Sequence, residues 1–240
     1  MWEWGTAWEW GGLVLDGDSP EYPPPTPPSV TMPPPSPVSL PRSWEAAPVA
    51  HLGPLLAGDN PLQRVLRQRR GGVARDTAAL VLRDCGLQRR HCQALTSLCT
   101  QLQHLVTLDL SRNKLRAEGA VALGNALVEL TCPLASLLLE DNHFGDRGLA
   151  AIASALEAAP VATTLTSFDV ARNEVSKAAP LVAILSSCEQ LADLDVSWNA
   201  LHEGAAVELA VALPRAKALR RLQLQFNTLG DEGCCAILRA

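Results

Sequence analysis

The residues of this chain that are best suited to chemistry are carboxylates that recur between residues 109 and 195. Carboxylates can serve as general acids and bases when a histidine or a nucleophile stands beside them. The sequence places no such partner in the same pattern, so we interpret these carboxylates as charges that bind a partner. They are Asp109, Glu140, Asp141, Asp169, Asp193 and Asp195.

Aromatic and arginine side chains form a second group of candidates. Trp198 and Phe226 occupy equivalent positions of a recurring motif, and Arg112 and Arg172 occupy that position earlier in the chain. Protein interfaces draw most of their binding energy from a few aromatic and arginine side chains. Trp198 and Phe226, flanked by Arg172 and Asp195, are therefore the predicted centre of a protein-binding surface. The alternative is that Trp198 packs on the neighbouring repeat and fills a gap in it.

Signatures of enzyme, cofactor and metal sites are missing from the sequence. It contains no G-x-x-x-x-G-K-[ST], G-x-S-x-G or H-E-x-x-H pattern. Cys92 and Cys99 fall on one face of a predicted helix, which favours a place in the core over a zinc site. Cys234 and Cys235 are neighbours on another helix and cannot face the same way, so we expect one buried and one exposed thiol. We predict no enzyme activity, no cofactor and no metal.

The element that must position these residues is a repeat. Residues 105–115 read LVTLDLSRNKL, which fits the pattern L-x-x-L-x-L-x-x-N-x-L. Alignment on the asparagine gives six units, separated by steps of 28, 29, 31, 26 and 28 residues. A period near 28 indicates a strand and a full helix in each unit. The aligned residues are Cys85, Asn113, Asn142, Asn173, Asn199 and Asn227.

This pattern resembles the ribonuclease-inhibitor type of leucine-rich repeat. The resemblance implies an α/β horseshoe solenoid over residues 77–240, with a parallel sheet inside, helices outside and about six repeats, the last incomplete. Leucines such as Leu108 and Leu110 would fill the core, and each asparagine would bond backbone groups of a neighbouring repeat. Cysteine can replace this asparagine, so Cys85 is expected to be structural. Ala179 aligns with the helical Gly119 of another repeat.

Strand geometry then places the candidate residues. Side chains alternate across a strand, so the residues between the buried leucines should line the concave face. Such a surface predicts a non-enzymatic scaffold or adaptor for a protein partner. Two alternatives stay open: a GTPase-activating protein of the Ran type, which is similar in repeat class, and a ciliary or axonemal scaffold, whose repeats resemble Ser197-Trp198-Asn199.

The first 76 residues differ in composition from the repeats. Residues 1–48 carry five of the six tryptophans, and 14 of the 18 prolines lie between Pro20 and Pro61. We expect 1–48 to be a disordered tail, because proline cannot continue a helix or an inner strand. Its proline runs could bind a domain that recognises proline-rich ligands. Residues 49–76 are the predicted N-terminal capping region, with a helix that begins after Asn60.

Charge and cysteine content bear on partners and compartment. The net charge of −5 gives no reason to expect a nucleic-acid partner, which usually needs a basic face. No secretory signal or long apolar run is visible, so we expect no membrane partner. Seven cysteines at repeat-like spacings favour a reducing compartment. The prediction is a cytoplasmic protein, with a ciliary location as the alternative.

Overall fold

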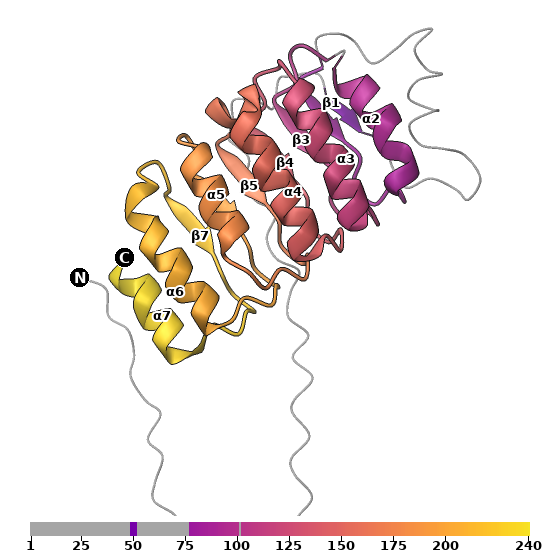
Figure 1. The fold of residues 1–240 in the computed structure, drawn as a ribbon. Helices are drawn as coiled ribbons and strands as arrows, with labels where there is room; N and C mark the ends of the chain where they lie inside the picture. The colour runs from indigo at the N-terminus through magenta and orange to yellow at the C-terminus, as the bar shows by residue number, and fades with distance from the viewer. Residues whose placement is uncertain (1–48, 52–76, 101) are drawn as a thin grey trace, which may run out of the picture. The chain divides into compact units, whose positions relative to one another are not determined.

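A computed structural model describes residues 49–51, 77–100 and 102–240 (Figure 1). The predicted tail over 1–48 and the predicted capping helix after Asn60 lie outside these residues. The described strands are β1 (Val49–His51), β2 (Ala79–Val81), β3 (Thr107–Asp109), β4 (Ser136–Leu138), β5 (Ser167–Asp169), β6 (Asp193–Asp195) and β7 (Arg221–Gln223). The α-helices are α2 (Cys92–Cys99), α3 (Arg116–Glu129), α4 (Gly145–Ala158), α5 (Ala179–Ser187), α6 (Glu203–Ala212) and α7 (Gly230–Arg239). Short 3₁₀ turns lie at η3 (Arg89–His91), η4 (Pro160–Thr163) and η5 (Leu213–Arg215).

The seven described strands form one open parallel sheet in chain order, β1 to β7. Each repeat enters the sheet in the same register, so the central residue of one strand pairs with the central residue of the next. These paired residues are Leu80, Leu108, Leu137, Phe168, Leu194 and Leu222. This register confirms the alignment on asparagine and stacks like positions of successive repeats beside one another.

Strand β1 was not expected from the sequence. It pairs Val49 with Ala79 and so adds a strand ahead of the first leucine motif. Three residues without the leucine pattern carry too little periodicity to predict a strand. The sheet, rather than the local sequence, provides the backbone partners that make these residues extended.

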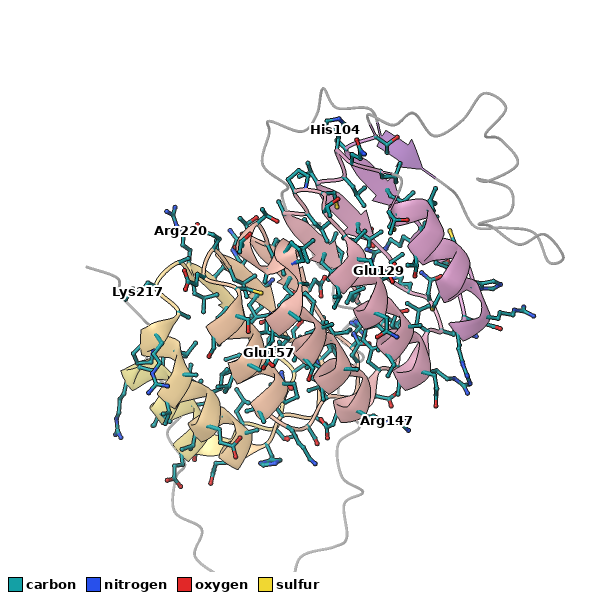
Figure 2. The ribbon with its side chains drawn as sticks, turned by 45° about the horizontal axis from the view of Figure 1, so that its top comes forward. His104, Glu129, Arg147, Glu157, Lys217 and Arg220 are labelled. Carbon is teal, nitrogen blue, oxygen red and sulfur yellow. The ribbon has the colours of Figure 1, made fainter. Side chains whose placement is uncertain are left out.

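The helices form a second layer along the sheet, and α3 to α7 follow one another side by side (Figure 1). Leucines between the two layers, such as Leu108 and Leu110, are fully buried. Charged side chains extend from the helices and connecting loops into solvent, as Glu157 and Lys217 show (Figure 2). This arrangement confirms the predicted solenoid with a parallel sheet on one side and helices on the other.

Buried asparagines join successive repeats, as the sequence predicted. The Oδ1 atom of Asn173 accepts hydrogen bonds from the backbone N–H groups of Asn142 (3.1 Å) and Phe144 (3.3 Å). Its Nδ2 donates to the carbonyls of Leu139 (2.9 Å) and Val170 (3.1 Å). Because Asn142 and Leu139 belong to the preceding repeat, each asparagine ties its own strand end to the repeat before it. Cys85 at the first such position is buried, as expected.

The fourth repeat corrects one detail of the alignment. Helix α5 begins six residues after Asn173, whereas α3 begins three residues after its own asparagine. As a result Ala178 is buried and Ala179 is exposed. The buried position equivalent to Gly119 is therefore Ala178, one residue closer to the asparagine, and the alignment of Ala179 with Gly119 was wrong.

Candidate protein-interaction surface

The residue that precedes each asparagine adopts a left-handed backbone conformation. This holds in all six repeats and for non-glycine residues of very different size. The φ angles are 53° at Asp84, 56° at Arg112, 56° at Asp141, 58° at Arg172, 54° at Trp198 and 59° at Phe226. The alternation of a strand does not reach these positions, because a left-handed residue turns the chain out of the extended conformation. They form a separate column, the turn column, beyond the carboxyl ends of the strands.

Three neighbours in the turn column stack on one another. The rings of Trp198 and Phe226 lie with centroids 3.8 Å apart at an interplanar angle of 18°. On the other side of Trp198, the guanidinium carbon of Arg172 lies 4.1 Å from the ring centroid. Trp198 is 41% exposed and Phe226 is 49% exposed. We call Arg172, Trp198 and Phe226 the aromatic patch. Trp198 thus contacts the neighbouring repeat and still faces solvent, and its part in protein binding stays a prediction.

Glu140 lies at the centre of a charge network that spans four repeats. Its Oε2 accepts a 2.6 Å hydrogen bond from Nη2 of Arg83 and lies 3.8 Å from Nε of Arg112. Its Oε1 lies 3.6 Å from Nε of Arg172. Arg83 was not among the predicted site residues. The signal for it was present, because Arg83 and Glu140 hold the same position of their repeats.

The aspartates of the inner strand positions are bonded to their own backbone. In three repeats an aspartate Oδ1 accepts a hydrogen bond of 2.9 Å from the N–H two residues later. The pairs are Asp109 with Ser111, Asp169 with Ala171 and Asp195 with Ser197. Oδ2 of Asp195 also accepts from Nε2 of Gln223 (2.9 Å). Asp109 is buried, whereas Asp169, Asp195 and Asp141 are half-buried. The carboxylates therefore form a largely satisfied inner surface beside the aromatic patch.

Known proteins share this repeat. A family model described as leucine-rich repeat matches residues 101–124, 132–153 and 217–238. Mouse ribonuclease inhibitor is 28% identical over 183 residues, which cover 75% of this chain and 40% of that protein. The chain is a leucine-rich repeat protein of the ribonuclease-inhibitor-like type. The asparagine ladder and the strand-plus-helix period agree with this family.

Other relatives of this leucine-rich repeat protein are much longer. Human NACHT, LRR and PYD domains-containing protein 5 is 31% identical over 159 residues, or 66% of this chain and 13% of that protein. Mouse NACHT, LRR and PYD domains-containing protein 12 is 30% identical over 159 residues, or 63% of this chain and 14% of that protein. The chain thus spans well under half the length of these relatives. Among the described residues, no helix is long and apolar enough to cross a membrane.

Asp169, on the inner surface of this leucine-rich repeat protein, has a pKa well above the ordinary value of an aspartate. Burial of the carboxyl raises its pKa to about 7, although the hydrogen bond that the N–H of Ala171 donates to it acts in the opposite direction. The negative charges of Asp195, Glu140 and Asp109 raise the same pKa further. A proton therefore occupies Asp169 in much of the population near neutral pH. This proton reduces the repulsion among the four carboxylates.

The described cysteines form no disulfide bonds with one another. Cys92 and Cys99 are buried, as the helical spacing predicted, and burial raises the pKa of Cys99 to about 12. Such thiols react slowly, because the thiolate is the reactive form. Cys234 and Cys235 are both exposed, which corrects the expectation that one would be buried. Helix α7 packs on α6, and its buried residue there is Gly233 rather than either cysteine. In the described part of the chain, no three His, Cys, Asp or Glu side chains are grouped to hold a metal ion.

Proposed function

We propose that this leucine-rich repeat protein is a non-enzymatic scaffold or adaptor that binds a protein partner across the concave face of its sheet and the turn column beside that face. The observation that carries the proposal is the aromatic patch, in which two large aromatic side chains stay exposed although they stack on each other. Aromatic side chains bury about 150–250 Å² each when they are covered, and they dominate interface energetics. An exposed, adjacent pair is therefore a natural centre for association.

Preorganisation supports the same proposal. Arg172, Trp198 and Phe226 share one backbone conformation in successive repeats, and strand pairing holds those repeats at a spacing of about 4.8 Å. A partner would meet a stack that is already formed. Binding then requires less loss of side-chain freedom, which on flexible surfaces costs about 0.5–1.5 kcal/mol for each immobilised side chain.

The predicted polar contacts surround this centre. Asp195 lies in the repeat of Trp198, and Asp169 and Arg172 lie in the repeat before it. Asp109, Arg112, Glu140 and Asp141 continue the surface toward the N-terminal repeats. We propose that the more exposed of these charges, such as Arg112 and Asp141, set orientation and partner choice, because rim charges contribute more to specificity and association rate than to affinity.

A relative supports protein binding, and the cysteines support a cytoplasmic location. One relative is named as a ribonuclease inhibitor, and a protein that inhibits an enzyme must bind it. The free thiols fit a reducing compartment such as the cytoplasm. Binding of a proline-recognising domain to residues 1–48 stays a prediction, as do activation of a small GTPase and a ciliary location.

The test of the patch uses the full chain as bait. Partners captured by the wild type are identified, purified and titrated against a Trp198→Ala/Phe226→Ala variant. Its matched control is Val207→Ala/Val211→Ala, which truncates two exposed apolar side chains on helix α6. Hot-spot truncations cost about 2 kcal/mol or more, so the patch variant should bind at least about 30-fold more weakly. The control should bind as the wild type does.

Two results would count against the proposal. Equal affinity of the wild type and the folded patch variant for every purified partner would remove the patch from the interface. Acceleration of GTP hydrolysis by any purified small GTPase would show that the non-enzymatic assignment is wrong and would favour the GTPase-activating alternative.

A further inference from the structure

Arg172 belongs to two sets of contacts at once. Its Nε lies 3.6 Å from Oε1 of Glu140, and its guanidinium carbon lies 4.1 Å from the ring centroid of Trp198. One rigid, planar group therefore joins the charge network of the earlier repeats to the aromatic patch. A guanidinium that covers an aromatic face must lie at a defined place over the ring, so whatever holds Arg172 also affects the ring.

Glu140 is well fixed to hold it. The residue is only 9% exposed, and its other carboxylate oxygen accepts the 2.6 Å hydrogen bond from Arg83. Arg112 lies 3.8 Å from that same oxygen. A buried carboxylate with a short hydrogen bond keeps one position more firmly than an exposed one does, because it exchanges fewer partners with water.

The arginine itself is not fixed by burial. Its side chain is 39% exposed, and a long exposed arginine side chain loses much of its rotamer freedom when it is held in one conformation. The ion pair with Glu140 and the stacking on Trp198 favour the same conformation. Without the carboxylate, the Arg172 side chain keeps the stacking contact with Trp198 and loses the ion pair that favours the same conformation.

We propose that Glu140 is a positioning residue for the aromatic patch: through Arg172 it keeps a guanidinium over Trp198, two repeats away from its own. Glu140 need not touch a partner to affect binding. The coupling concerns the unbound protein, and its relevance to partner binding rests on the proposed function. Arg83 extends the coupling to the first repeat, because it holds the opposite side of the carboxylate.

The experiment observes Trp198 directly. The full chain is labelled with fluorotryptophan, and the Trp198 signal is assigned in the fluorine NMR spectrum by its disappearance in Trp198→Phe. Spectra are then compared for the wild type, Glu140→Gln and a control, Asp193→Asn. The control removes one carboxylate from the repeat of Trp198 itself, where Asp193 lies 3.6 Å from Nε of Arg221.

We expect Glu140→Gln to move the Trp198 signal and Asp193→Asn to leave it in place. Sodium chloride should move the wild-type signal only a small part of the way toward that of Glu140→Gln, because salt screens a partly buried ion pair weakly. In a chain that already carries Arg172→Met, the further change Glu140→Gln should have no effect on Trp198. This loss of additivity identifies Arg172 as the connection. Once a partner is in hand, Glu140→Gln should weaken its binding about twofold to fivefold.

The outcomes separate the two proposals. If Glu140→Gln leaves the Trp198 signal unchanged, or moves it equally with and without Arg172, Glu140 does not position the patch, whatever the patch binds. If the signal moves as expected while patch truncation leaves partner affinity unchanged, the coupling stands and the proposed function fails. A circular-dichroism melt of each variant shows whether a moved signal reflects unfolding, and Glu140→Asp gives a second, charged variant that should restore part of the wild-type shift.

Discussion

Replacement of Asp169 by asparagine should stabilise the protein at high pH and leave it nearly unchanged at low pH. The pKa of Asp169 is about 7 in the folded chain and about 3.8 when unfolded. Between these values the folded protein keeps a proton that the unfolded chain releases. Stability therefore falls as pH rises, by about 1.4 kcal/mol for each pH unit.

The magnitude follows from the width of that interval. Three pH units would give about 4 kcal/mol above pH 7, and the partial exposure of Asp169 reduces this to about 2–4 kcal/mol. Asparagine cannot ionise, but its Oδ1 can still accept the 2.9 Å hydrogen bond from the N–H of Ala171. Asp169→Asn should thus gain about 2–4 kcal/mol at pH 8. At pH 4 the folded aspartate is protonated and neutral like asparagine, so most of the gain should be gone.

Urea denaturation of the full chain from pH 4 to pH 8 measures this difference. Asp146→Asn is the control of opposite sign. Burial would raise the pKa of Asp146, but hydrogen bonds from Ser176 and Lys177 together hold that pKa below its ordinary value. Its carboxylate stabilises the fold above the unfolded pKa, and this stabilisation is lost as pH falls. Asp146→Asn should therefore destabilise the protein at pH 8.

One pattern of results would refute the reasoning on Asp169. If the stability difference between Asp169→Asn and the wild type stayed constant over the whole pH range, the carboxyl would ionise alike in both states. The burial of the carboxyl, and with it the repulsion from Asp195 and Glu140, would then be absent in solution.

Two further predictions concern the ladder and the thiols. Asn173→Ala leaves the two N–H groups that its Oδ1 accepts without a partner, so it should lower the free energy of unfolding by about 2–6 kcal/mol in urea titration. Glu157→Ala on the exposed face of α4 should change the same quantity by less than about 0.5 kcal/mol, and equal losses would show that the ladder has no special role. Among the described residues, brief alkylation of the native protein should modify Cys234 and Cys235, and mass spectrometry should find Cys99 modified only after denaturation; early labelling of Cys99 would contradict its burial.

The architecture could be predicted because burial imposes a strict pattern on residue types. Leu108 and Leu110 have no polar atoms to satisfy and must face the core, and Asn113 bonds backbone groups that no leucine could serve. These demands recur in every repeat and leave a periodic signal. Strand β1 leaves none, because its three residues are held extended by pairing with β2.

The site was predicted in part, for a related reason. Exposed positions tolerate many residue types, so their identities carry information only when they are unusual, as at Trp198 and Phe226. The stacking of Arg172 on Trp198 depends on the left-handed conformation of the turn column, which strand alternation does not describe. The ion pair of Arg83 with Glu140 forms because a long side chain reaches across an intervening repeat. Equivalent positions in the repeats do not show which side chains make such a contact.

The turn column separates recognition from folding. Every one of its positions has the same backbone conformation, yet they hold aspartate, arginine, tryptophan and phenylalanine. Because the fold accepts such different side chains there, each position can change by itself without repacking the core. Asp84, Arg112 and Asp141 are thus places where a new binding specificity could be selected, or engineered, one repeat at a time.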